Sequence, residues 1–224
     1  MLDGGSGDDR LTGGSNNVLF IGGKGDDTVR LGSGSNVVAF DRGDGRDVIQ
    51  SESGGTSTLS LGAGIRLQDL AFRRSGDNLI LETGNNESIT FDNWYRSRSN
   101  QAFTKLQFVT EGMTGPGGST ELDDKIETFD FRKLVGAFDS ARARNPGLSR
   151  WALTNSLASF HLDNVHNNSK ALGGDLAYAY GTAGSLAGIG LGAAQDVLTS
   201  AQFGKESQAL HPVSGLKEGL VKLA

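Results

Sequence analysis

The chain has 224 residues and a formal net charge of −5, from 21 lysines and arginines against 26 aspartates and glutamates. Nucleic-acid binding needs a clustered basic surface, which this balance argues against. No apolar stretch approaches the ~20 residues of a membrane-spanning helix. The chain also contains no cysteine. A fold outside the cell would therefore lack disulfides, and a bound metal is the obvious substitute.

The first part of the chain repeats a phrase of nine residues. The phrases "GGSGDDRLT", "GGSNNVLFI", "GGKGDDTVR" and "LGSGSNVVA" begin at residues 4, 13, 22 and 31, and a fifth, "FDRGDGRDVI" (40–49), carries an insertion. Glycine is dense here, and its total of 34 residues is about twice the usual share of roughly 7%. The eighth position is large and apolar in every phrase: Leu11, Phe20, Val29, Val38 and Ile49.

This pattern predicts a turn and a short strand in each phrase. A helix does not tolerate glycine at this density, whereas a three-residue strand places its middle side chain on one face. Two phrases then form one coil of a flattened parallel β-roll, with successive strands in alternate sheets. Odd turns stack along one edge of the roll, and even turns stack along the other.

Acidic residues mark only the odd turns. Asp9, Asp27 and Asp47 belong to the first, third and fifth phrases, so they are expected to line the same edge. Carboxylates stacked at strand spacing repel one another. Ca²⁺ reverses this repulsion because it accepts six or more oxygen ligands, and glycine-rich turns expose carbonyls that can complete the set. Two calcium sites are therefore predicted on the odd edge.

The even edge offers poorer ligands. Its corresponding positions hold Val18, Asn36 and Ser57. Valine cannot bind a metal, and a site here would depend on carbonyls such as those of Gly14 and Asn16. The sequence predicts either no calcium on this edge or one weak site.

The first and third phrases resemble the glycine- and aspartate-rich nonapeptide of RTX proteins, a calcium-binding repeat. The resemblance implies that carbonyls and the aspartate of one turn bind the metal together with those of the turn two phrases later. Under this resemblance the first site consists of Gly5, Gly7, Asp9, Gly22, Lys24 and Asp27. The second consists of Gly23, Gly25, Asp27, Phe40, Arg42 and Asp47, with Asp44 as a substitute because of the insertion.

Alternating patterns follow the repeats. "LSLGAGI", "LAFRR", "DNLILET", "ESITFDNWY" and "KLQFVTEGM" predict successive strands between residues 59 and 113. These strands are expected to cap the open end of the roll, with Phe91 and Trp94 in the core. Their order also resembles the segment that follows the repeats in many RTX proteins.

Helical periodicity begins after "TGPGGSTELDD" (114–124), the best linker in the chain. A first helix is expected to present Phe131, Leu134, Val135, Phe138 and Ala141, and to end at "NPG" (145–147). Ser149 is expected to cap a second helix that carries Leu153, Leu157 and Phe160. Further helices are predicted around 172–181, in "GAAQDVLTSAQF" and in the amphipathic end Leu216–Ala224.

No active site is predicted. His161 and His166 are five residues apart and lack the glutamate that zinc proteases place after the first histidine. Ser185 lies between glycines, but no strand precedes it to form a nucleophile elbow.

The predicted fold is mainly β, and α+β overall. It has a calcium-binding parallel β-roll (1–60), a β-rich capping segment (61–118) and a helical C-terminal region (119–224) that carries an export signal. The chain opens on Leu2 and Asp3, which resemble the end of an earlier strand. It is therefore expected to be part of a larger protein.

The RTX resemblance implies a secreted or cell-surface protein, such as an adhesin. It would leave through type I secretion machinery by an uncleaved C-terminal signal and fold as a monomer on extracellular calcium. The alternative is a carbohydrate-binding accessory module of a secreted polysaccharide-modifying enzyme. That alternative predicts an exposed basic or aromatic groove, for which the candidates are Arg30, Arg42, Arg46, Arg73 and Arg74.

Overall fold

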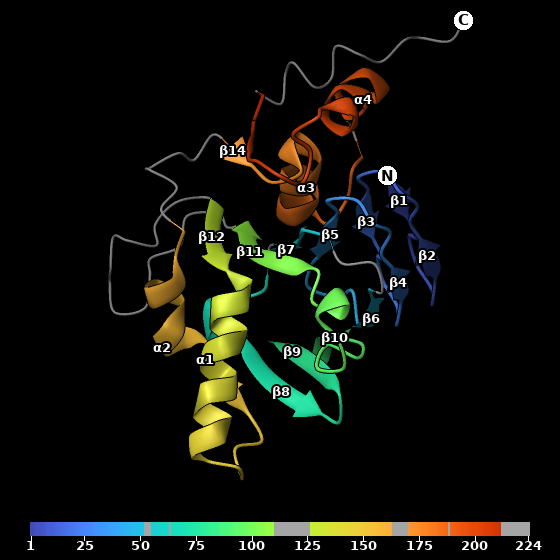
Figure 1. Ribbon diagram of the computed structural model, residues 1–224. Helices are drawn as coiled ribbons and strands as arrows, with labels where there is room; N and C mark the ends of the chain where they lie inside the picture. The colour runs from blue at the N-terminus through green and yellow to red at the C-terminus, as the bar shows by residue number, and fades with distance from the viewer. Residues whose placement is uncertain (52–54, 63, 110–125, 163–169, 188, 212–224) are drawn as a thin grey trace, which may run out of the picture.

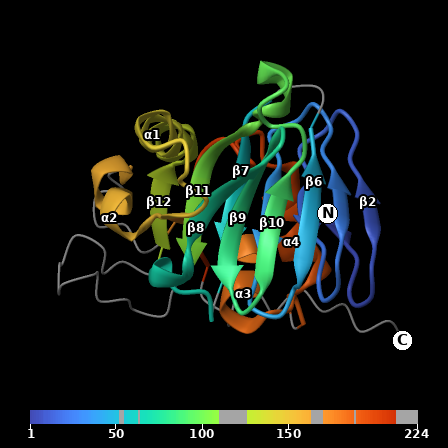
Figure 2. The ribbon, with the colours of Figure 1, turned by 90° about the horizontal axis from the view of Figure 1, so that it is seen from below.

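The computed structural model describes residues 1–51, 55–62, 64–109, 126–162, 170–187 and 189–211 (Figure 1). The structure is rich in strands. Two mixed sheets of six and seven strands face each other, and helices lie on the outer face of one sheet and at the end away from the repeats (Figures 1 and 2). In the described residues, no helix is long and apolar enough to span a membrane.

The repeat strands alternate between the two sheets. The six-stranded sheet receives β1 (Leu2–Asp3), β3 (Leu19–Ile21), β5 (Val37–Phe40) and β7 (Ser57–Leu61). The seven-stranded sheet receives β2 (Arg10–Thr12), β4 (Thr28–Arg30) and β6 (Arg46–Gln50). All neighbours within these two groups pair in parallel, with Leu2 opposite Phe20 and Arg10 opposite Thr28. Each coil of the repeat segment therefore contains two nine-residue phrases, as the period predicts.

Both sheets continue beyond the repeats, and there they become mixed. In the six-stranded sheet, β7 pairs in parallel with β11 (Phe103–Val109), which pairs antiparallel with β12 (Ile126–Asp130). In the seven-stranded sheet, β6 pairs in parallel with β10 (Glu87–Phe91), followed by antiparallel β9 (Asn78–Gly84) and β8 (Ala71–Ser75). The last strand of each repeat group is thereby paired. Two short 3₁₀ helices, η1 (Leu67–Asp69) and η2 (Arg98–Asn100), join these strands.

The first predicted helix is confirmed as α1 (Phe131–Arg144). Asp130 caps its N-terminus by accepting a hydrogen bond from the amide of Lys133 at 3.0 Å. Its apolar face packs into the core between the two sheets, where the Phe131 ring lies 5.1 Å from that of Phe91 and 5.6 Å from that of Trp94. Phe91 and Trp94 are both buried, as expected.

The second predicted helix is confirmed only in part, because its helical turns begin at Thr154 and not at Ser149. After Ser149 the chain forms strand β13 (Trp151–Ala152), which pairs antiparallel with β8, before the short α2 (Thr154–Leu157) and η4 (Ala158–Phe160). The amide of Leu153 donates to the carbonyl of Leu70 at 3.0 Å. Pairing with the open edge of β8 satisfies backbone groups that a helix starting at Ser149 would leave at that edge.

The remaining described segments are β14 (Lys170–Ala171), α3 (Gly174–Ala183), α4 (Leu191–Thr199) and β15 (Gln208–Ala209). Helices α3 and α4 match the expected third and fourth helices to within a few residues. Residues 114–124, His166 and Leu216–Ala224 lie outside the described residues.

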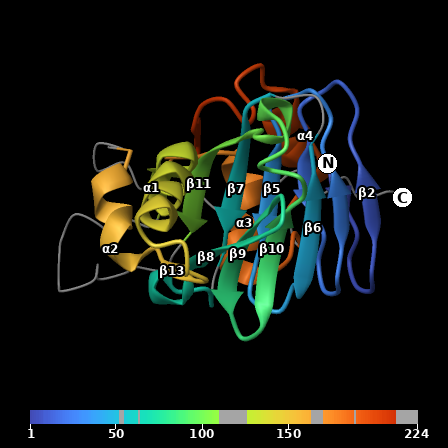
Figure 3. The same cartoon turned by 60° about the horizontal axis from the view of Figure 1, so that its bottom comes forward.

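Helices α3 and α4 cover the outer face of the six-stranded sheet (Figures 1 and 3). Leu176, Ala177 and Val197 pack there against the outward side chains of β3 and β5, such as Leu19 and Val37. Strands β3, β5 and β7 of this sheet are therefore buried on both faces, whereas β2, β4 and β6 alternate between more and less buried positions. A sheet covered on both faces needs continuous apolar strands, which explains why the even phrases read "LFI" and "VVAF".

This double burial predicts different costs for substitutions in two matched strands. Leu19→Ala in β3 is expected to lower the free energy of unfolding by about 2–5 kcal/mol, since it opens a cavity against the helices. Arg10→Ala, on the exposed face of β2, should change it by about 0.5 kcal/mol or less. Urea unfolding in excess calcium measures both. Equal effects of the two changes would contradict the packing of α3 and α4 on this sheet.

Candidate metal centre

Three turns stack along one edge of the repeat segment, each leading from a strand of the six-stranded sheet to one of the seven-stranded sheet. They span residues 4–9, 22–27 and 42–47. Backbone hydrogen bonds join them: the amide of Gly7 donates to the carbonyl of Lys24 at 2.7 Å, and the amide of Lys24 donates to Gly5 at 2.9 Å. The predicted stacking of the odd turns is therefore present in the structure.

The third of these turns differs from the expected register. The amide of Gly25 donates to the carbonyl of Asp44 at 3.2 Å, as Gly7 does to Lys24. Asp44 is therefore the counterpart of Lys24, and Arg42 is the counterpart of Gly22. The backbone agrees, because glycines with positive φ occupy the same two positions in every turn: Gly5 and Gly7, Gly23 and Gly25, Gly43 and Gly45.

Phe40 consequently lies outside the stack. It is the last residue of β5, and its carbonyl accepts a hydrogen bond from the amide of Gly62 at 2.9 Å. Phe40 and Asp41 are the inserted residues, and the pairing offset grows accordingly, with Thr28 opposite Val48. The structure therefore brings Arg42, Asp44 and Asp47 to this edge and leaves Phe40 in the sheet.

The three sixth-position aspartates form a ladder. The amide of Asp9 donates to Oδ1 of Asp27 at 2.7 Å, and the amide of Asp27 donates to Oδ1 of Asp47 at 3.0 Å. The second oxygens of Asp9 and Asp27 are buried and have no hydrogen-bond partner. A buried charged oxygen without a partner is strongly unfavourable. A cation that binds oxygen would satisfy both atoms.

Glycines line the space that these oxygens face. A Cβ atom on Gly4 would lie 2.5 Å from the carbonyl oxygen of Gly22 and 2.8 Å from Oδ2 of Asp9, and a Cβ on Gly22 would clash with Oδ2 of Asp27. The Gly22 carbonyl and Oδ2 of Asp9 thus lie beside Gly4, and Oδ2 of Asp27 lies in the equivalent position beside Gly22, where any larger residue would fill the space. The carbonyl of Gly5 already accepts one backbone hydrogen bond but keeps a second lone pair.

The electrostatics of this edge favour a bound cation. Burial, together with the neighbouring carboxylates of Asp27 and Asp44, raises the pKa of Asp47 to about 8. Burial also raises the pKa of Asp27, that of Asp44 to about 6 and that of Asp41 to about 7. Ionising these groups without a counterion is therefore unfavourable in the fold.

The donor set fits calcium. In the described part of the chain, no three His, Cys, Asp or Glu side chains gather closely enough to hold a metal by themselves. Each pair of turns supplies two carboxylates, so the other ligands must be backbone carbonyls. Hard cations such as Ca²⁺ accept such oxygens, whereas zinc sites use histidine, cysteine and carboxylate side chains.

On the even edge the side-chain amide of Asn36 forms hydrogen bonds with the neighbouring backbone. Oδ1 of the buried Asn36 accepts from the amide of Val18 at 3.0 Å, and its Nδ2 donates to the carbonyls of Gly34 and Gly32 at 3.2 and 3.4 Å. The amide group thus supplies donors to turn carbonyls, where the odd edge has only acceptors. Ser57 has a buried hydroxyl without a hydrogen-bond partner.

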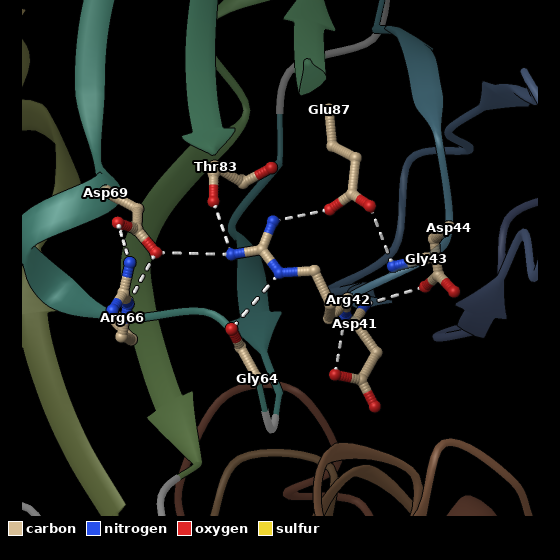
Figure 4. A network of polar contacts seen from close by, with 9 residues as sticks. All are labelled: Asp41, Arg42, Gly43, Asp44, Gly64, Arg66, Asp69, Thr83 and Glu87. Atoms are coloured by element: carbon tan, nitrogen blue, oxygen red, sulfur yellow. Dashed lines mark hydrogen bonds and ion pairs between the residues drawn. The ribbon is translucent and has the colours of Figure 1, made fainter. Parts of the chain in front are cut away.

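The side chain of Arg42 ties the third turn to the strands beyond the repeats (Figure 4). Its Nη1 donates to Oε2 of Glu87 at 2.6 Å, and its Nη2 lies 3.3 Å from Oδ2 of Asp69. It also donates to the carbonyls of Thr83 and Gly64 at 2.7 and 3.1 Å. The repeat pattern contained no signal for this network, because its partners come from three separate elements.

Within the described residues, the histidine and serine candidates lie apart from one another. His161 contacts Glu127 at 2.5 Å, and Ser185 is exposed on the loop after α3. Of the arginines considered for a groove, Arg42 is enclosed by its partners, Arg74 lies 4.0 Å from the centre of the Tyr95 ring, and Arg73 pairs with Glu82. Arg30 and Arg46 are exposed on the seven-stranded sheet.

Comparison with known families identifies the repeat. Residues 3–38 match the model of the RTX calcium-binding nonapeptide repeat in four copies. A comparison with curated proteins gives no match. Repeats of this kind are typical of secreted proteins. The chain therefore carries RTX repeats, and the metal that these repeats bind is calcium.

The shared carboxylate of Asp27 generates a prediction. Asp27→Ala is expected to weaken both calcium sites, because Asp27 faces turns on both sides. Asn36→Ala should leave the calcium stoichiometry unchanged but reduce stability by about 1–3 kcal/mol, since the amide of Val18 loses its partner. Calorimetric titration with calcium and urea unfolding separate the two effects. Equal losses of calcium binding in both variants would refute the assignment of the metal to the odd edge.

The raised pKa values of Asp41, Asp44 and Asp47 generate a second prediction. Unfolded aspartates titrate near ~3.9, so the metal-free fold takes up protons that the unfolded chain does not. Its stability should therefore rise as the pH falls from about 8 towards about 4. The calcium-induced increase in Tm is expected to be larger at about pH 8 than at about pH 5.

Thermal unfolding in excess calcium and in excess chelator, at both pH values, measures this difference. Asp47→Asn should remove much of the pH dependence, because Asp47 has the highest pKa of the three. A calcium-induced shift that does not change with pH would be inconsistent with these buried carboxylates.

Proposed function

We propose that this chain is the calcium-binding C-terminal part of a secreted RTX protein, and that its repeat segment is a parallel β-roll that folds on calcium outside the cell. One observation carries the proposal. The Oδ2 atoms of Asp9 and Asp27 are buried without hydrogen-bond partners, each beside a glycine of its own turn, and the carbonyl of Gly22 lies beside the first of them. The match to RTX repeats over the same residues supports calcium as the occupant.

Two calcium sites follow from the register of the turns. The proposed ligands of the first site are Gly5, Gly7, Asp9, Gly22, Lys24 and Asp27. Those of the second site are Gly23, Gly25, Asp27, Arg42, Asp44 and Asp47, where Arg42 and Asp44 take the places first expected for Phe40 and Arg42. The glycines, Lys24, Arg42 and Asp44 contribute carbonyl oxygens, and the sixth-position aspartates contribute carboxylates.

Calcium then acts as part of the fold. Without it, the stacked carboxylates oppose folding, and the glycine-rich turns lose much conformational entropy when they become ordered. Binding of a metal to the folded state alone adds its binding free energy to folding. Extracellular calcium modules have Kd values of roughly 10⁻⁴–10⁻³ M. Such affinities would leave the segment open in the cytoplasm and folded outside.

Export is proposed to use type I secretion machinery and an uncleaved signal at the C-terminal end, within the region that finishes in Leu216–Ala224. The upstream part of such a protein would be a surface adhesin, and this part would act as a monomer. Fusion of a passenger upstream of Thr120 tests the export step. Secretion of the passenger together with residues 120–224 supports it, and retention of the fusion in cells that carry the machinery contradicts it.

One observation favours a second candidate function, the binding of carbohydrate. The outer face of the seven-stranded sheet has a polar hollow of about 430 Å³. Arg46, Arg73 and Arg150 line it together with Glu82 and Glu87. Paired guanidinium and carboxylate groups can bind sugar hydroxyls, as a carbohydrate-binding accessory module would. Binding of the purified chain to a glycan array would favour this function.

Calcium-dependent compaction is the main test of the proposed function. Far-ultraviolet circular dichroism and size-exclusion chromatography are expected to show an expanded chain in chelator and a compact, strand-rich one after calcium is added. Magnesium serves as the control ion, because its octahedral preference suits these carbonyl-rich turns poorly. A chain that is as compact after exhaustive chelation as it is in calcium would contradict the proposal.

A further inference from the structure

Helix α3 contacts the third turn of the odd edge (residues 42–47) through one side-chain hydrogen bond. The hydroxyl of Tyr180 donates to Oδ2 of Asp44 at 3.0 Å, and both side chains are buried. The same carboxylate oxygen accepts the amide of Asp41 at 2.6 Å (Figure 4). Asp44 therefore holds the inserted residues and the helix together, while its own carbonyl accepts from Gly25 in the stack of turns.

Close packing fixes the position of this tyrosine. Gly181 lies so near the six-stranded sheet that a Cβ on it would be 2.9 Å from Cβ of Val109. A Cβ on Gly62 would in turn lie 2.6 Å from Cα of Gly181. The helix ends at Gly184, whose amide donates to the carbonyl of Tyr180 at 2.7 Å. The Tyr180 ring thus projects from a helix that has little freedom to shift.

The third turn differs from the other two in needing such support. Two additional residues precede it, so its entry from β5 is longer than the entries from β1 and β3. The counterpart of Asp44 in the second turn is Lys24, whose side chain is exposed. Among the described residues, Tyr180 alone on α3 makes a side-chain hydrogen bond to these turns.

We propose that Tyr180 is a positioning residue for the second calcium site. Its hydrogen bond to Asp44 holds the turn 42–47 in the conformation in which the carbonyls of Arg42 and Asp44 face Gly23, Gly25 and Asp27. This inference rests on the proposed function, since it presupposes calcium at that site. Because coupling between two binding events is reciprocal, calcium at the second site also favours docking of α3 on the sheet.

The selectivity of the effect distinguishes positioning from general stability. Loss of the Tyr180 hydroxyl should weaken the second site roughly tenfold, as expected for one hydrogen bond to a charged group. The first site, formed by turns 4–9 and 22–27, should keep its affinity. A merely structural role would instead affect both sites equally or neither.

The test is calorimetric calcium titration of the full chain, with Tyr180→Phe and the matched control Tyr178→Phe. Tyr178 lies on the same helix and is half-buried, and in the described part of the chain its hydroxyl makes no hydrogen bond. We expect Tyr178→Phe to keep the calcium affinity of both sites. Tyr180→Phe should lower the calcium affinity of the second site about tenfold and leave that of the first site unchanged. Two unchanged sites in Tyr180→Phe, or equal losses at both sites, would overturn the inference.

A double-mutant cycle with Asp44→Ala checks the route of the effect. If Tyr180 acts through Asp44, Tyr180→Phe should add nothing in the Asp44→Ala background, whereas additive losses would refute that route. Hydrogen exchange of the α3 amides gives an independent readout, with calcium expected to slow exchange more in the wild type than in Tyr180→Phe. Absence of calcium binding in the wild type would defeat the proposed function itself. Normal binding by Tyr180→Phe would defeat this inference alone.

Discussion

The architecture depends on carboxylates stacked at strand spacing. Asp27 and Asp47 each accept a backbone amide through one carboxylate oxygen, and Asp9 and Asp27 each leave an oxygen buried without a partner. Parallel pairing forces this arrangement, because coils that stack in register bring every sixth position of the odd phrases together. The fold thus concentrates negative charge where water is excluded, and at neutral pH a bound cation offsets the repulsion.

The polar groups of the stacked turns are satisfied by different chemistry on the two edges of the repeat segment. On the even edge, Asn36 both accepts from the amide of Val18 in the preceding coil and donates to the carbonyls of its own turn. On the odd edge, aspartate can only accept, so turn carbonyls and carboxylates face one another. The backbone differs as well, because the glycines with positive φ in the odd turns, such as Gly23 and Gly25, have no counterparts at Gly32 and Gly34. The change from carboxylate to amide thus accompanies a change in the conformation of the turn.

The third turn joins the repeats to the rest of the chain. The Arg42 side chain links it to η1, β9 and β10, and the Asp44 side chain links it to α3. The same two residues contribute the carbonyls proposed for the second calcium site. The turn 42–47 therefore contacts the proposed metal site, the strands beyond the repeats and helix α3. It lies in the phrase that carries the insertion.

Periodic features of this protein could be read from the sequence alone. The nine-residue phrase predicts the strands and their inward side chains, and the eighteen-residue spacing of aspartates predicts the metal edge, because a repeated local pattern determines its own stacking. The register after the insertion, the strand at Trp151, the Arg42 network and the Tyr180 contact could not be predicted. Each depends on residues far apart in the chain, whose pairing leaves no periodic trace and is decided by which backbone edges and buried charges remain to be satisfied.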